Sequence, residues 1–163
     1  MQTLDEMKPQ QSPELLKSLH ILTRDGKINQ DSRRKLKQVY HLYNFIEPTL
    51  EKLNQEKEHY LIVDHGCGKS YLGFILYDLF IKQNLGKVIG IDTREELVEG
   101  AKQLASKLKF DRMEFINSSI AEAENLIDDQ VDMVTALHAC DTATDDAIYF
   151  GLKRKAKYFF LIP

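Results

Sequence analysis

The stretch that decides the fold is residues 60–71, which read YLIVDHGCGKSY. Its first four residues are apolar and partly β-branched, the composition of a short buried strand. Two glycines, Gly66 and Gly68, then mark a turn, and after Tyr71 the apolar residues recur at helical spacing. A strand that enters a helix through a glycine turn lets a ligand approach backbone amides and the helix N-terminus. The stretch therefore predicts a ligand site in an α/β domain.

The chain that follows alternates between strands and helices. After residues 60–63 we expect strands over residues 87–92, 113–116, 131–137 and 158–162. Between them we expect helices over residues 72–80, 93–108, 121–126 and 144–155. Such βαβ repetition implies a parallel sheet with helices on both faces, and right-handed crossovers make it doubly wound. We predict a Rossmann-like α/β fold with strand order 3-2-1-4-5 over residues 59–163.

Residues 1–58 precede this pattern and form, in our prediction, a helical segment that packs on the core. Ser12 followed by Pro13 is typical of a helix start. A second helix is indicated by six apolar residues at helical spacing: Leu36, Val39, Tyr43, Ile46, Leu50 and Leu53. Pro48 interrupts this stripe, so we expect a kink there or two helices that meet.

Composition sets the broad class of the protein. The chain has 163 residues, 43% of them hydrophobic, and a net charge of -3, which favours one globular domain without a global attraction for polyanions. No apolar run is long enough to span a bilayer, and residues 1–11 are too polar for a signal peptide, so we expect a soluble cytoplasmic protein with no membrane partner. Cys67 and Cys140 do not suggest a disulfide framework. The basic residues at 33–37 fit a solvated helix face, with a phosphate-contacting face as the alternative.

Three nucleotide-binding motifs compete for the glycine turn. A P-loop needs a glycine where Val63 stands, and a dinucleotide fingerprint needs one where Tyr71 stands. What remains is acid-x-Gly-x-Gly, beginning at Asp64, the pattern of loops that bind S-adenosylmethionine (SAM). Asp64 can serve the amino group of SAM directly or through water.

Two further polar sites follow the second and third strands. Asp92 lies 24 residues after Gly68 and can accept hydrogen bonds from both ribose hydroxyls; its alternative role is to cap the next helix. Thr93 and Glu96 have the spacing of a capping box at that helix. Ser119 stands where many SAM enzymes use an acid to bind the adenine amino group, although a plain loop is an equal alternative there.

The fourth site is the loop after the fourth strand, residues 137–145. His138 and Asp141 are the candidate catalytic residues, because they can position an acceptor or take its proton. Alternatively, Asp141 or Thr144 caps the next helix and His138 is a satisfied core residue. The predicted cofactor contacts are Asp64, Gly66, Cys67, Gly68, Asp92, Thr93, Ser119 and Leu137.

Three of these motifs resemble one known family. They are VDHGCGKSYL at 63–72, GID at 90–92 and LHACDTATDDA at 137–147. The third is fairly specific to the methyltransferase-domain family that includes the glutathione S-transferase C-terminal domain-containing protein, and the similarity runs from about residue 33 to residue 163. The resemblance implies a class I methyltransferase that uses SAM, and it makes RNA a possible acceptor alongside protein. Family members usually continue after the fifth strand with a Pro-Cys-Cys turn and further strands, so we expect a truncated form.

This leaves alternatives for the function. A SAM-binding module without activity of its own is the second hypothesis, because the chain ends early. A nucleotide hydrolase that uses residues 68–70 is the third, and Val63 argues against it. The expected truncation also leaves the fifth strand as an edge open to pairing.

A metal site is the remaining possibility for the strand ends. His65 and Cys67, with His138 and Cys140, make a ligand set that suits zinc. The glycines at 66 and 68 turn the chain immediately after the strand. The side chains of His65 and Cys67 therefore do not point in the same direction. We therefore expect no metal and interpret both cysteines as small buried residues.

Overall fold

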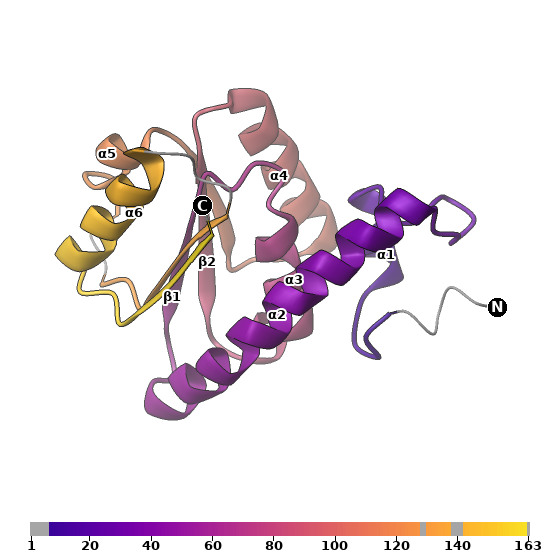
Figure 1. Ribbon diagram of the computed structural model, residues 1–163, viewed down its shortest axis with the longest axis horizontal. Coiled ribbons are helices and arrows are strands. Elements are labelled where there is room, and N and C mark those ends of the chain that lie inside the picture. The colour runs from indigo at the N-terminus through magenta and orange to yellow at the C-terminus, as the bar shows by residue number, and fades with distance from the viewer. Residues whose placement is uncertain (1–6, 128–129, 138–141, 163) are drawn as a thin grey trace.

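The computed structural model describes residues 7–127, 130–137 and 142–162. Its centre is a five-stranded sheet in the order β3-β2-β1-β4-β5, with every neighbouring pair parallel (Figure 1). The strands are β1 (Leu61–His65), β2 (Lys87–Asp92), β3 (Met113–Asn117), β4 (Met133–Leu137) and β5 (Tyr158–Ile162). The predicted fold class and strand order are confirmed. β5 is an edge strand, and all five of its residues are half-buried.

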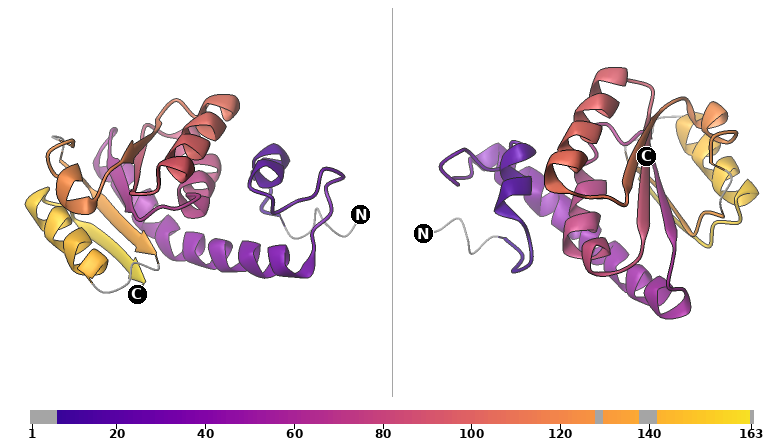
Figure 2. Two further views of the ribbon diagram at one scale, coloured as in Figure 1. Left: turned by 90° about the horizontal axis from the view of Figure 1, so that it is seen from above. Right: turned by 180° about the vertical axis from the view of Figure 1, so that it is seen from behind.

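Helices cover both faces of the sheet (Figure 2). They are α1 (Pro13–Ser18), α2 (Gln30–Glu56), α3 (Tyr71–Leu79), α4 (Glu95–Leu108), α5 (Ile120–Ala123) and α6 (Thr142–Lys153), with a 3-10 turn at Ile81–Gln83. One hydrophobic cluster lies between the sheet and α1 to α4, and a second lies between the sheet and α5 and α6. This division follows from right-handed crossovers that run outward from β1 in both directions.

The long helix α2 is the main addition to the sheet. All six apolar residues of its predicted stripe are buried. Pro48 lies inside one uninterrupted helix, so the expectation of two helices was wrong. The buried stripe continues on both sides of the proline, and its burial offsets the backbone hydrogen bond that the proline removes. At about 1.5 Å per residue, α2 is about 40 Å long, enough to run the whole height of the sheet. It packs against α3, which is why α3 is buried all round, from Leu72 to Leu79.

The segment before α2 is tied to α3 and α4. The Ser12 side chain accepts from the N–H of Leu15 and caps α1, as predicted. The N–H of Ser12 donates to Oδ2 of the buried Asp78 on α3 at 2.7 Å, and the Gln11 amide donates to the same oxygen. The segment is therefore anchored on the same face of the sheet as α2.

The start of α4 differs from the prediction. The N-cap is Arg94, with no side-chain cap, so the expected capping box of Thr93 and Glu96 was wrong. The Asp92 carboxylate instead accepts from the N–H of Arg94, which sets the helix start later. No helix in the described part of the chain is both long and apolar enough to cross a membrane.

Candidate functional site

The glycine turn lies at the carboxyl ends of β1 and β2. Gly66 has φ of +61° and Gly68 of +57°, the left-handed conformation that favours glycine. The turn folds back on β2, because the N–H of Cys67 donates to the Ile91 carbonyl at 3.0 Å and that of Gly68 to Asp92 Oδ2 at 2.7 Å. A Cβ on Gly66 would meet no atom within 4 Å, so the space in front of the turn is open.

A pocket of about 470 Å³ lies in front of this turn. Its size falls within the range of about 300–1,000 Å³ that is usual for small-molecule sites. Loops and strands contribute these lining residues: Asp64, Gly66, Cys67, Gly68, Lys69, Arg94 and Leu137. Helices α2 and α3 contribute the rest: Lys35, Gln38, Val39, Leu42, Tyr71 and Leu72. The pocket lies where the chain leaves β1 for one face and β4 for the other, the usual ligand position in such sheets.

Asp64 is the one acid that lines this pocket among the described residues. Only 4% of it is exposed, and its Oδ1 accepts from the Thr135 hydroxyl at 2.7 Å. Burial raises the pKa of Asp64 to about 7; the Thr135 hydrogen bond opposes this shift, and the nearby Asp92 carboxylate adds to it. A cationic ligand in the pocket would favour the ionised carboxylate. The partner Thr135 could not be predicted, because nothing in the sequence distinguishes it from a core residue of β4.

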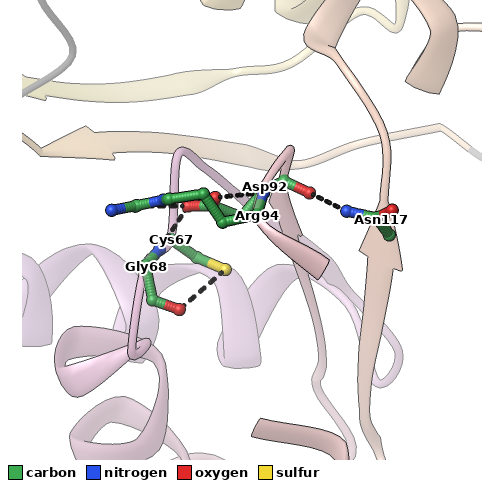
Figure 3. A network of polar contacts seen from close by, with 5 residues as sticks. All are labelled: Cys67, Gly68, Asp92, Arg94 and Asn117. Carbon is green, nitrogen blue, oxygen red and sulfur yellow. Dashed lines mark hydrogen bonds and ion pairs between the residues drawn. The ribbon is translucent and has the colours of Figure 1, made fainter. Parts of the chain in front are cut away.

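Asp92 is already fully engaged in the structure (Figure 3). Its Oδ1 accepts from Nε and the N–H of Arg94, both at 2.9 Å, and its Oδ2 accepts from Arg94 Nη2 at 2.9 Å and from Gly68. Burial by itself raises the pKa of Asp92, but the hydrogen bonds from Arg94 and Gly68 outweigh it and hold the pKa below its ordinary value. A ribose diol would have to replace the guanidinium of Arg94. Sequence reasoning did not single out Arg94; its only signal is its place two residues after the acid.

The pocket brings together five of the eight predicted cofactor contacts: Asp64, Gly66, Cys67, Gly68 and Leu137. Asp92 lies behind Gly68 and Arg94. Thr93 is exposed and is not among the lining residues. Ser119 is also outside the lining: its hydroxyl caps α5 in a capping box with Glu122, so a contact with adenine stays a prediction.

The remaining candidates are residues 138, 140, 141 and 144. His138, Cys140 and Asp141 lie outside the described residues, so their catalytic and zinc-binding roles are untested. Thr144 lies inside α6 rather than at its N-cap. Across residues 7–127, 130–137 and 142–162, no group of three or more His, Cys, Asp or Glu side chains could hold a metal ion.

The sequence matches one family model. Residues 34–163 match a family described as a methyltransferase domain. This match takes in α2 from its second turn onward and the whole sheet. No curated protein matches the chain.

Solved structures with a similar fold include several methyltransferases. An rRNA methylase from Streptococcus thermophilus has a TM-score of 0.50 and 19% identity, over 60% of this chain and 56% of that one. The bifunctional kinase-methyltransferase WbdD has a TM-score of 0.56 and 17% identity, over 76% of this chain and 27% of that one. PKMT2 from Rickettsia typhi, in complex with AdoHcy, has a TM-score of 0.51 and 17% identity, over 61% of this chain and 19% of that one. The matched region is thus about half of the first structure and less of the others, and the likeness shows the fold.

Proposed function

Because the chain belongs to the methyltransferase-domain family, we propose that it binds SAM in the pocket beside Gly66 and transfers the methyl group to an acceptor. Its sheet is the Rossmann-like fold of a class I methyltransferase. The observation that carries the proposal is the left-handed turn at Gly66 and Gly68, which leaves open space in front of it and lies beside Asp92.

The residues of the pocket fit the parts of SAM. The glycines allow close approach to the backbone, and Asp64 can face the cationic amino group and sulfonium. Asp92 can accept from the ribose hydroxyls once Arg94 leaves it. SAM supplies a methyl group on a reactive sulfonium, so the task of the chain is to hold donor and acceptor in line. We assign proton transfer from the acceptor to His138 or Asp141.

The acceptor is the finer part of the proposal. The resemblance of residues 137–147 to the family that includes the glutathione S-transferase C-terminal domain-containing protein supports RNA as the acceptor, with protein as the other candidate. The test is incubation with SAM that carries a tritiated methyl group, together with separate pools of RNA and protein. Label in RNA is expected. Tight SAM binding with no label in either pool would favour the alternative, a SAM-binding module without activity of its own.

Arg94 is expected to compete with the cofactor for Asp92. Arg94→Ala should raise the affinity for SAM about threefold, because the arginine side chain is 57% exposed and such ion pairs are weak. Asp92→Ala should instead lower the affinity, by about 1–3 kcal/mol, because two hydrogen bonds to the diol are lost. Isothermal titration calorimetry measures both, with Lys102→Ala as a control on an exposed ion pair of the same helix. Weaker binding by the Arg94→Ala protein would show that Arg94 contacts the cofactor.

SAM binding is expected to depend on pH through Asp64. Since the pKa of this carboxyl is raised to about 7, the free protein holds its proton below that pH, and a cationic ligand drives the proton off. The affinity for SAM should therefore rise about tenfold from about pH 5.5 to about pH 7. This range lies below the pKa of an α-amino group, about 7.7, so the amino group of SAM keeps its positive charge. The free energy of unfolding of the ligand-free protein should fall over the same pH range. The reason is that the Asp64 carboxyl ionises at a lower pH in the unfolded chain than in the folded one. An Asp64→Asn protein should bind more weakly with a flatter pH profile; an unchanged slope would remove Asp64 from the site.

A further inference from the structure

The pocket contains positive charge that has no role in the proposed function. Three cationic side chains line the pocket: Lys35 from α2, and Lys69 and Arg94 from the loops. The charge of Arg94 is paired with Asp92. Neither lysine forms an ion pair with an acid among the described residues, and Lys35 is the one that α2 contributes.

Lys35 is held above the first residue of α3. Its Nζ lies 5.1 Å from the centre of the Tyr71 ring, at a distance typical of a cation–π contact. Helix α3 begins there, and its N-cap Ser70 provides no side-chain hydrogen bond to the first turn. The N–H groups of a first turn have no partner within the helix, and the helix dipole is positive at this end. The ammonium of Lys35 and the start of α3 thus favour an anion at the same place.

The opposite charge also lines this pocket. Asp64 extends from β1, and the open turn at Gly66 lies next to it in the same pocket. An acid from β1 and a cation from α2 in one pocket form a pair of charges complementary to an amino acid, whose α-ammonium and α-carboxylate share one carbon.

Resting on the proposed function, we propose that Lys35 binds the α-carboxylate of the methionine part of SAM, together with the first turn of α3. Helix α2 is then part of the cofactor site and not only a cover for α3. This also separates Lys35 from the rest of the basic cluster at 33–37. Arg34 pairs with Asp31 on the helix surface, and Lys37 is exposed and away from the pocket lining.

The test compares two ligands that differ in one group. SAM and decarboxylated SAM are titrated by calorimetry into the full chain and into its Lys35→Met, Lys35→Arg, Lys37→Met and Lys69→Met variants. The wild-type protein should bind SAM about tenfold more tightly than the decarboxylated form, the usual size of one charge-assisted hydrogen bond. Lys35→Met should reduce this ratio to about two or three, the share left to the first turn of α3, chiefly by weakening SAM. Lys35→Arg and Lys37→Met should preserve it.

Other outcomes are distinguishable. A wild-type protein that binds neither ligand contradicts the proposed function itself. A wild-type preference for SAM that is undiminished in Lys35→Met contradicts the role of Lys35 alone. A preference that falls only in Lys69→Met places the carboxylate on the glycine turn instead. Thermal melting of each variant shows that the fold is intact.

Discussion

Replacement of Gly66 by valine is expected to weaken SAM binding about 100-fold, or about 2.8 kcal/mol, the upper end of the about 1–3 kcal/mol that overpacking costs at a close contact. A Cβ at this position would enter open space in the pocket, where the methionine part of SAM is proposed to lie. The left-handed φ of +61° adds a cost of about 1–2 kcal/mol to the fold, because an L-residue resists that conformation. Calorimetry with SAM measures the first effect and urea unfolding the second.

The chain offers a matched control for this substitution. Gly26 also has a positive φ, +78°, and a Cβ there would meet nothing within 4 Å, but it lies in a turn of the N-terminal segment. Gly26→Val should therefore lose similar stability and keep the wild-type affinity for SAM. Equal loss of affinity in both variants would mean that the effect comes from the fold and that SAM does not approach Gly66.

The largest expected effect on stability is that of Asp132→Ala, a loss of about 3 kcal/mol. Asp132 is buried between β1 and β4, with 4% of it exposed. Its Oδ2 accepts from the N–H of Leu61 at 2.9 Å, and its Oδ1 accepts from Lys57 Nζ at 2.7 Å. The substitution leaves the Leu61 N–H without its acceptor and releases the end of α2 from the sheet. The free energy of unfolding in urea measures the loss.

Two variants separate the parts of this contact. Asp132→Asn keeps an acceptor for Leu61 and loses the charge opposite Lys57, so it should cost clearly less than Asp132→Ala. Lys157→Ala breaks the neighbouring but exposed pair with Glu56 and should leave the unfolding midpoint unchanged. If Asp132→Ala unfolds at the wild-type midpoint, this contact does not stabilise the fold.

The sheet was predictable because its signals are local. Each strand is a short apolar run between turn or helix signals, and βαβ repetition with right-handed crossovers predicts a parallel sheet covered by helices. The second and fifth strands have the predicted limits. Each of the other three differs from its predicted range by one or two residues at one end or both. The glycine turn could be interpreted in the same way, because its spacing excluded the competing motifs.

The parts that were missed depend on contacts between distant residues. The buried stripe of α2 was clear, but nothing in it indicates which face of the sheet it covers or that Lys35 lines the pocket in front of the glycine turn. The expected capping box at Thr93 was wrong because the Asp92 carboxylate takes the N–H of Arg94.

Titration calorimetry of SAM into the full chain, beside the Gly66→Val variant, tests the central claim most directly. The wild-type protein should show one binding site per chain, with micromolar or tighter affinity, and S-adenosylhomocysteine should compete for it. Gly66→Val should bind about 100-fold more weakly. Absence of binding by the wild-type protein, or equal binding by both proteins, would contradict a SAM site at the glycine turn between β1 and α3.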